Sequence, residues 1–219
     1  MFKHLAVGAE APERVRMKSL LRILVVAFAV FIAGLANAAT DGAQPIPWNA
    51  ERPLTWIDYR GIPDPGASPS IGARTHLLLA YSYQYIKDYD ASSRRYRAYV
   101  YASSLKVDCL FDPYESWVRP DAQSDRLLNH EQRHFDLAEV YAQKMRSALQ
   151  SVTAWGASAA AAEQALKTQV AATAGQINQR WHEIDAQYDH ESVGGTDPSA
   201  QALWDQRIDA WLVQPSQAP

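Results

Sequence analysis

The hydrophobic periodicity of this chain changes once, near residue 124, and that change constrains the fold more than any other feature. Before it, THLLLAYSYQYIKDY (75–89) and RYRAYVYASSLKVDCLF (95–111) place apolar residues with the period of a β-strand. After it, apolar residues recur at helical spacing. We therefore predict an α+β domain, in which an N-terminal antiparallel β meander is followed by three helices.

The three helices are expected at about 124–151, at about 158–188 and from Asp197 onward. Asp197 is a favourable N-cap residue, and Pro198 suits the first helical position that follows it. The last two helices keep apolar residues in helical register along their whole length.

Shorter segments are assigned by their composition. LTWIDY (54–59) alternates enough to predict another strand. Prolines and glycines predict a loop over 60–73, and residues 112–123 are also read as a loop. The second long strand is expected to bend near Ser103 and Ser104.

The N-terminus has the pattern of a signal peptide. A basic stretch beginning at Met17 precedes the apolar run LVVAFAVFIAGL (24–35) and the small-residue site Ala-Asn-Ala (36–38). We predict a signal peptide over 1–38, with Met17 as an alternative initiator and an uncleaved anchor as the alternative reading. A periplasmic or secreted protein is then expected, with no stable membrane span after cleavage.

The rest of the chain is acidic and almost free of cysteine. Removal of 1–38 leaves 16 Lys and Arg against 22 Asp and Glu, a net charge of −6, so neither nucleic acid nor an anionic membrane is an expected partner. Cys109 is the single cysteine, which excludes an internal disulfide. We expect an extended linker over 39–53, a single domain over 54–213 and a flexible tail over 214–219.

The first predicted helix carries a zincin-like H-E-x-x-H motif within LLNHEQRHFDLAEVYAQKM (127–145). His130 and His134 are four residues apart, so one turn of helix places them on the same face, where both can bind one metal ion. A Zn²⁺ ion there would activate a water, and Glu131 would serve as the general base. The alternative is a pair of packed histidines held by hydrogen bonds.

A catalytic zinc site usually takes three protein ligands and a water, so a third ligand is needed. The segment RWHEIDAQYDHESVGGTD (180–197) offers several, because antiparallel packing would bring the end of the second helix to the start of the first. His190 is the first choice, with Asp189 or Glu191 as alternatives.

Three segments resemble a known bacterial family. They are SWV (116–118), HEQRHFDLAE (130–139) and YDHESVGGTDPSAQALW (188–204), and they are similar to the predicted secreted zinc-dependent proteases, also called domain of unknown function 922. The resemblance covers roughly 54–212 and implies a periplasmic or secreted protein with a metallopeptidase site, but no particular substrate. Gly194 stands where the family's Y-D-x-x-T-x-H-G motif has a histidine.

These features predict a periplasmic or secreted zinc-dependent metallopeptidase, a hydrolase acting on an unidentified peptide or protein. Arg95–Phe111, just before the motif helix, is the candidate strand for holding an extended peptide by edge pairing. Gly194 favours an alternative, a non-catalytic envelope binding protein on a peptidase-like scaffold with a degenerate metal site. A structural envelope protein with packed histidines is the third reading. Zinc content and a Glu131→Gln variant distinguish the first two, and the third predicts no metal and little change of stability when a chelator is added.

Overall fold

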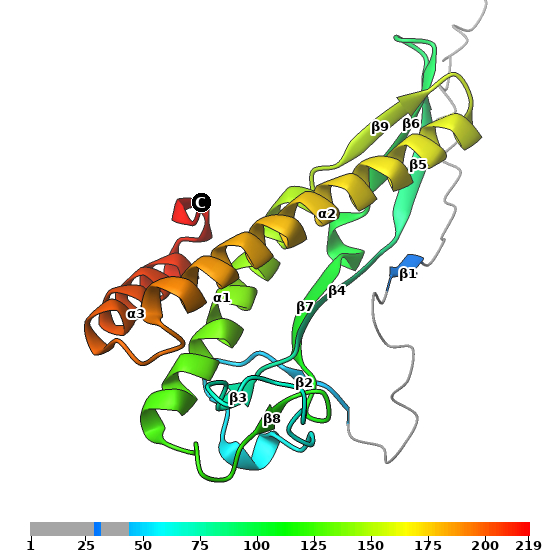
Figure 1. The fold of residues 1–219 in the computed structure, drawn as a ribbon. Coiled ribbons are helices and arrows are strands. Elements are labelled where there is room, and N and C mark those ends of the chain that lie inside the picture. The colour runs from blue at the N-terminus through cyan, green and yellow to red at the C-terminus, as the bar shows by residue number, and fades with distance from the viewer. Residues whose placement is uncertain (1–28, 32–43) are drawn as a thin grey trace, which may run out of the picture.

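The computed structural model describes residues 29–31 and 44–219 and shows a mixed α+β architecture of antiparallel sheets and three helices (Figure 1). The helices are α1 (Asp125–Leu149), α2 (Ala159–Ser192) and α3 (Pro198–Val213). The predicted signal segment, 1–38, lies outside the described residues apart from the three-residue strand β1 (Ala29–Phe31). Within the described part of the chain, no helix has the length and apolar character needed to cross a membrane.

Each helix begins at a residue whose side chain caps it. The Ser124 hydroxyl accepts a hydrogen bond from the backbone of Leu127 at the start of α1, and Ser158 caps α2 in the same way. The Asp197 carboxylate caps α3, which has proline at its first position as predicted. The helix positions expected from the sequence are therefore confirmed, and α2 extends four residues beyond 188.

The strands form three antiparallel sheets. Their orders are β1-β4-β7-β2, β3-β8 and β5-β6-β9. The bounds of the remaining strands are Ile46–Pro47 (β2), Ala73–Arg74 (β3), Leu77–Tyr83 (β4), Tyr85–Asp90 (β5), Arg95–Val100 (β6), Lys106–Phe111 (β7), Trp117–Val118 (β8) and Thr153–Gly156 (β9). Short 3-10 helices occur at Trp56–Asp58 (η1), Ala102–Ser104 (η2) and Pro215–Gln217 (η3).

The two long predicted strands form one bent antiparallel hairpin, in which β4 pairs with β7 and β5 pairs with β6. At the bend, the Tyr101 N–H donates to the Gln84 carbonyl at 2.8 Å, and the Gln84 N–H donates to Ser104 Oγ at 2.8 Å. The predicted bend near Ser104 therefore coincides with η2. It divides the hairpin between two sheets.

Three features differ from the sequence-based prediction. Strand β8 lies within 112–123, which was predicted as a loop. The strands are not all N-terminal, because β9 follows α1 and joins the edge of β6. Residues 54–59 contain η1 (Trp56–Asp58) and no strand, because the Asp58 carboxylate accepts hydrogen bonds from both the backbone and the hydroxyl of Thr55 and closes a tight turn.

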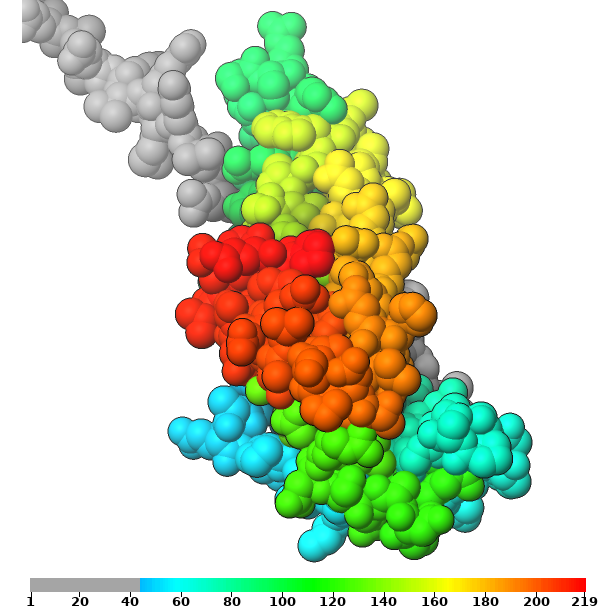
Figure 2. Space-filling model, turned by 60° about the vertical axis from the view of Figure 1, so that its left-hand side comes forward, coloured from blue at the N-terminus to red at the C-terminus, as the bar shows by residue number. Residues whose placement is uncertain are grey.

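Helix α1 lies at the centre of the molecule and supplies much of the core. It packs against β7 on one side and against α2 and α3 on the others. Its buried residues include Phe135, Leu137, Val140, Tyr141, Met145 and Leu149, and the Cys109 thiol is buried against them. Figure 2 shows α3 and the C-terminal half of α2 together on one face of the molecule. Residues 214–219 contain η3, and the Ala218 carbonyl accepts a hydrogen bond from Lys144.

Candidate metal centre

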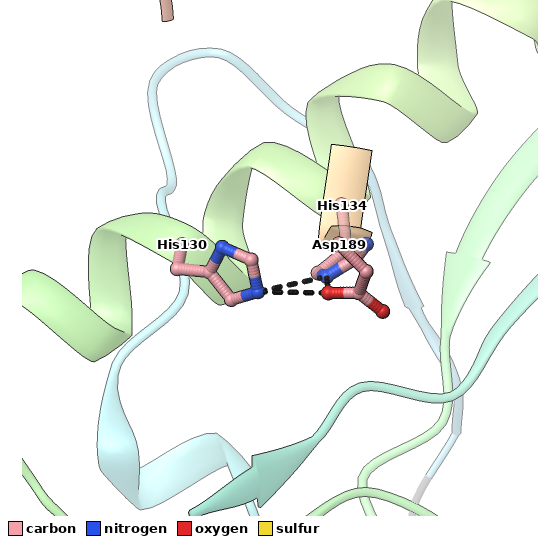
Figure 3. Close-up of side chains that lie close together, drawn as sticks. All are labelled: His130, His134 and Asp189. Carbon is pink, nitrogen blue, oxygen red and sulfur yellow. Dashed lines mark hydrogen bonds and ion pairs between the residues drawn. The ribbon is translucent and has the colours of Figure 1, made fainter. Parts of the chain in front are cut away.

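Three side chains from two helices converge on one point (Figure 3). His130 and His134, one turn apart on α1, have their Nε2 atoms 3.2 Å from each other. Asp189, near the end of α2, places Oδ1 3.1 Å from each of those nitrogens. Both imidazoles are buried, whereas the Asp189 side chain is 54% exposed, so the triad opens toward solvent.

Antiparallel packing of α1 and α2 brings the triad together. The end of α2 lies beside the first half of α1, so residues far apart in sequence become neighbours. Tyr188 fills the space behind the imidazoles, with its ring centroid 4.8 Å from those of both His130 and His134. Its hydroxyl donates to the His130 carbonyl at 3.1 Å, and this hydrogen bond connects α2 to α1 next to the triad.

A carboxylate orients the second imidazole. The Nδ1 atom of His134 lies 2.7 Å from Oδ1 of Asp185, one turn before Asp189 on α2. An ionised carboxylate only accepts hydrogen bonds, so Nδ1 of His134 carries the proton. The Nε2 lone pair is then directed at the triad, in the arrangement that metal-binding histidines usually have.

An amide from α3 orients the first imidazole. The Nδ1 atom of His130 lies 3.1 Å from Oε1 of Gln201. The Gln201 amide nitrogen donates to the Tyr188 hydroxyl and to Asp205 Oδ1, both at 2.8 Å, which settles which end of the amide faces His130. Nδ1 of His130 is therefore the donor, and its Nε2 lone pair also faces the triad.

Two imidazole lone pairs and a carboxylate oxygen that converge in this way suit a divalent cation. Ligands held about 2.0–2.1 Å from a tetrahedral Zn²⁺ ion lie about 3.3 Å apart. The three donor separations of 3.1–3.2 Å come close to that value. The triad therefore fits a site with three protein ligands and one position left for water or substrate. His130, His134 and Asp189 form a candidate metal-binding group.

The charges around the triad change its titration. Burial lowers the pKa of His134, but the charge of Asp185 and the hydrogen bonds to Asp185 and Asp189 outweigh it and raise that pKa well above the ordinary value. Burial raises the pKa of Asp189, but its contacts with His130 and His134 hold it well below the ordinary value. Without metal, the site therefore binds a proton, and a cation has to displace it.

Glu131 lies beside the triad and is held by the strand segment opposite. It is buried, and its Oε2 accepts a 2.5 Å hydrogen bond from the Thr75 hydroxyl. Because that hydroxyl proton is used, the Tyr59 hydroxyl is the donor in its 2.8 Å contact with Thr75 Oγ1. Burial and then the charge of Glu131 raise the pKa of Tyr59 well above the ordinary value, so Tyr59 stays a donor.

The triad and Glu131 line one cleft of about 850 Å³. Residues 70–75, including β3, form one wall, and residues of α2 and the turn after it, among them His190 and Gly194, form the other. A cleft of this size admits a chain segment as well as a small molecule.

The structure separates the three candidates for the third donor. Asp189, an alternative in the sequence prediction, joins the triad. His190, the first choice, lines the cleft but lies outside the triad. Glu191 accepts hydrogen bonds from the indole of Trp204 and from Arg207 instead. Each step along α2 turns the side chain by about 100°, so only one of three consecutive residues can face His130.

The turn at Gly194 takes a different role from the one that the resemblance implies. Gly194 has a φ of +58°, and a Cβ atom there would contact nothing within 4 Å. The next residue, Gly195, packs directly on His130: a Cβ atom at Gly195 would lie 2.7 Å from Cβ and Cγ of that histidine. This turn therefore supports the back of the His130 ring, and the donor set is complete without a histidine at 194.

Three supporting residues were not predicted from the sequence: Tyr59, Thr75 and Gln201. Asp185 belongs to the predicted ligand segment 180–197, and its place four residues before Asp189 puts it on the same helix face, where it supports His134. Gln201 and Thr75 reach the site from 71 and 56 residues away along the chain.

A family model described as bacterial protein of unknown function (DUF922) matches residues 72–195, more than half of the chain. The chain belongs to this family. The DUF922 match includes α1, α2, the whole triad, Glu131 and Thr75, and it ends before α3. No curated protein and no solved structure matches the chain. The family description assigns no activity, so the function has to be argued from the site.

Proposed function

We propose that this protein is a zinc-dependent metallopeptidase of the periplasm or the cell exterior. One observation carries the proposal: His130, His134 and Asp189 converge as three metal donors, and Glu131 lies beside them in the same cleft. Two imidazoles and a carboxylate suit Zn²⁺, and the open side of the triad leaves a coordination position for catalysis. The residues 1–38, with their signal-peptide pattern, support the location.

The roles of the side chains follow from their positions. His130, His134 and Asp189 would hold the zinc, which supplies a Lewis acid and lowers the pKa of a nearby water. Glu131 would take a proton from that water and pass it to the leaving amine. Thr75 holds Oε2 of Glu131, so Oε1 remains free to accept the proton.

The burial of the base supports the same reaction. Glu131 is only 4% exposed and its held oxygen makes no ion pair with Lys or Arg among the described residues. The side chain is therefore kept in one orientation by neutral hydrogen bonds and stays free to exchange a proton. A structural glutamate in the core is normally paired with a cation, as Glu139 is with Arg146.

Metal analysis and a matched pair of variants test the proposal. The purified mature protein should contain about one zinc per chain, and it should cleave unfolded, carboxymethylated casein. Glu131→Gln should keep the zinc and lose 10²–10⁴-fold in kcat, which is the usual contribution of a positioned acid–base group. Glu183→Gln serves as the control, because Glu183 lies on α2 outside the triad and its carboxylate accepts hydrogen bonds from Gln179 and Arg180.

Two outcomes would contradict the proposal. Absence of bound zinc after reconstitution would remove the metal centre. Cleavage by Glu131→Gln at the rate of the unmodified protein would remove the assigned base. A protein that keeps zinc and shows no cleavage with or without Glu131 would instead be the binding protein on a peptidase-like scaffold.

A further inference from the structure

The wall of the cleft opposite α2 is a strand with one free edge. Strand β3 pairs with β8 along its other edge, and the residues on both sides of it continue that pairing. The Gly72 carbonyl accepts from the Arg119 N–H at 2.8 Å, and the His76 N–H donates to Ser116 Oγ at 2.9 Å. The backbone groups of residues 72, 74 and 76 therefore point toward β8.

Backbone groups in an antiparallel strand alternate between its two edges, so those of Ala73 and Thr75 point away from β8. Within residues 29–31 and 44–219, the backbone N–H and C=O groups of Ala73 and Thr75 have no hydrogen-bond partner. Both residues line the cleft, and Ala73 is only 7% exposed. Poorly solvated backbone groups of this kind normally have partners, so this edge is suited to receive one.

Thr75 connects the free edge with the base. Its backbone belongs to the edge, while its hydroxyl donates to Glu131. The side chains of Ala73 and Thr75 share the face of β3 that lies on α1, since successive side chains alternate between faces. A peptide strand paired with this edge would therefore cross the cleft that contains the triad. Thr75, which also holds Glu131, would fix the position of that peptide along the cleft.

The segment predicted from the sequence to hold a peptide, 95–111, does not line the cleft with the triad. Residues 95–111 form β6 and β7, and each of these strands lies between two others in its sheet. Strands β5 and β9 pair with the two edges of β6, while β7 pairs with β4 on one edge and, over two residues, with β2 on the other. Among the strands of the described residues, β3 and β8 have residues that line the cleft with the triad, and β3 has the larger share, with Ala73 and Arg74 against Trp117 of β8.

We propose that the ligand of this cleft is an extended polypeptide that pairs with the free edge of β3 as an added strand, and that Thr75 sets its register on Glu131. This inference rests on the proposed peptidase function and names its substrate class. Pairing through backbone groups recognises the peptide chain itself and depends little on its sequence. Thr75 is a positioning residue, because it acts through Glu131.

Hydrogen–deuterium exchange tests the pairing without requiring cleavage. Zinc-loaded Glu131→Gln protein is compared with and without a saturating concentration of unfolded, carboxymethylated casein, saturation being checked by fluorescence anisotropy. The amides of Ala73 and Thr75 should exchange at least tenfold more slowly in the complex. The Arg74 amide, which already faces β8, is the internal control. Bound casein without protection at Ala73 and Thr75 would overturn the proposal.

Substitution of the edge provides a second test. Ala73→Pro removes one edge N–H and leaves the groups that face β8 in place, and proline is tolerated on strand edges. It should weaken casein binding at least tenfold with unchanged zinc content, whereas Ala73→Val, which keeps the N–H, should bind normally. Equal affinity in both variants would contradict the edge pairing.

The role of Thr75 is tested by the split between KM and kcat for casein cleavage. Thr75→Val removes the hydroxyl and should lower kcat at least tenfold with KM unchanged, and Thr75→Ser should restore kcat. Equal loss of kcat in both variants would contradict the positioning role of Thr75.

Protection of the β3 amides by casein, without any cleavage by the unmodified protein, would overturn the peptidase function. The pairing of a peptide with the edge of β3 would then still hold.

Discussion

At the scale of single residues, the proton on His134 competes directly with a metal ion. Asp185 and Asp189 raise the pKa of His134 well above its ordinary value, against the effect of burial. In the metal-free protein the imidazole therefore keeps its proton to a higher pH than an ordinary histidine does. Because a protonated imidazole cannot bind metal, the affinity of the site for zinc should rise with pH until the pH exceeds the raised pKa of His134.

We expect zinc binding at pH 7 to release a proton from His134. Asp185→Asn removes the charge that raises the pKa of His134, so this variant should release fewer protons. Calorimetric titration in buffers of different ionisation enthalpy measures the number released. Glu183→Gln should behave as the unmodified protein, and binding by the unmodified protein without proton release would contradict the prediction.

Gln201 should matter for metal affinity although it binds no metal. Gln201→Ala leaves the Nδ1 atom of His130 without its acceptor and frees the imidazole to rotate. Loss of such an outer hydrogen bond typically lowers metal affinity 10–100-fold. Competition with a chromophoric chelator measures the change. Gln206→Ala, at an exposed position of the same helix, is the control, and equal affinities in the two variants would count against the assigned role.

The sequence placed part of the centre but not all of it. His130, Glu131 and His134 could be positioned because they lie within one turn of one helix. The choice between Asp189 and His190 could not, because they are neighbours on α2 and the packing of α2 against α1 decides which one faces the triad. Thr75 and Gln201 come from segments remote in sequence, where no periodicity indicates a contact.

At the scale of elements, the turn between α2 and α3 supports the site. Gly194 and Gly195 both have positive φ values, so alanine at either position should cost about 1–2 kcal/mol of stability. Only a Cβ atom at Gly195 would collide with His130. Gly195→Ala should therefore weaken metal binding while Gly194→Ala does not, as measured by urea unfolding and chelator competition. Equal metal affinity in the two variants would contradict this view of the turn.

Glu163 links α2 to β5 through Lys87, at 2.6 Å, and also pairs with Lys167. Hydrogen bonds from Lys167, Lys87 and Tyr85 lower its pKa from 4.5 to about 2. A lowered carboxyl pKa stabilises the fold above pH 4.5, and that stabilisation is lost as the pH falls toward 2. Glu163→Gln should lower the free energy of unfolding by up to about 1 kcal/mol at pH 7. Urea unfolding at a series of pH values should show that the difference between the two proteins disappears as the pH falls from 4.5 to about 2. A constant difference from pH 7 to 2 would contradict the assignment.

The helices were predictable and the short strands were not, for physical reasons. Each helix repeats its apolar pattern over several turns and begins at a capping residue. Strands β3, β8 and β9 have only two to four residues, too few to show an alternating pattern. Residues 54–59 did alternate, but the hydrogen bonds within Thr55–Asp58 favoured a tight turn over an extended chain.

At the scale of the whole molecule, the triad joins α1 to α2, so a bound ion should stabilise the fold. Zinc at 100 times its dissociation constant should add about 2.7 kcal/mol to the free energy of unfolding. His134→Ala should abolish this gain, because it removes a donor. Thermal unfolding with zinc and with a chelator measures it, and a melting temperature that zinc leaves unchanged would contradict metal binding by the folded protein.

The orientation of His130 depends on a helix that lies outside the family match. A fragment trimmed to residues 72–195 would keep every donor atom and Glu131 but lose α3 and its glutamine, together with Tyr59 on the N-terminal side. Such a truncated protein would report a weak ion affinity and poor activity for reasons unrelated to its chemistry. Expression boundaries for relatives of this chain should therefore extend through the equivalent of residue 213.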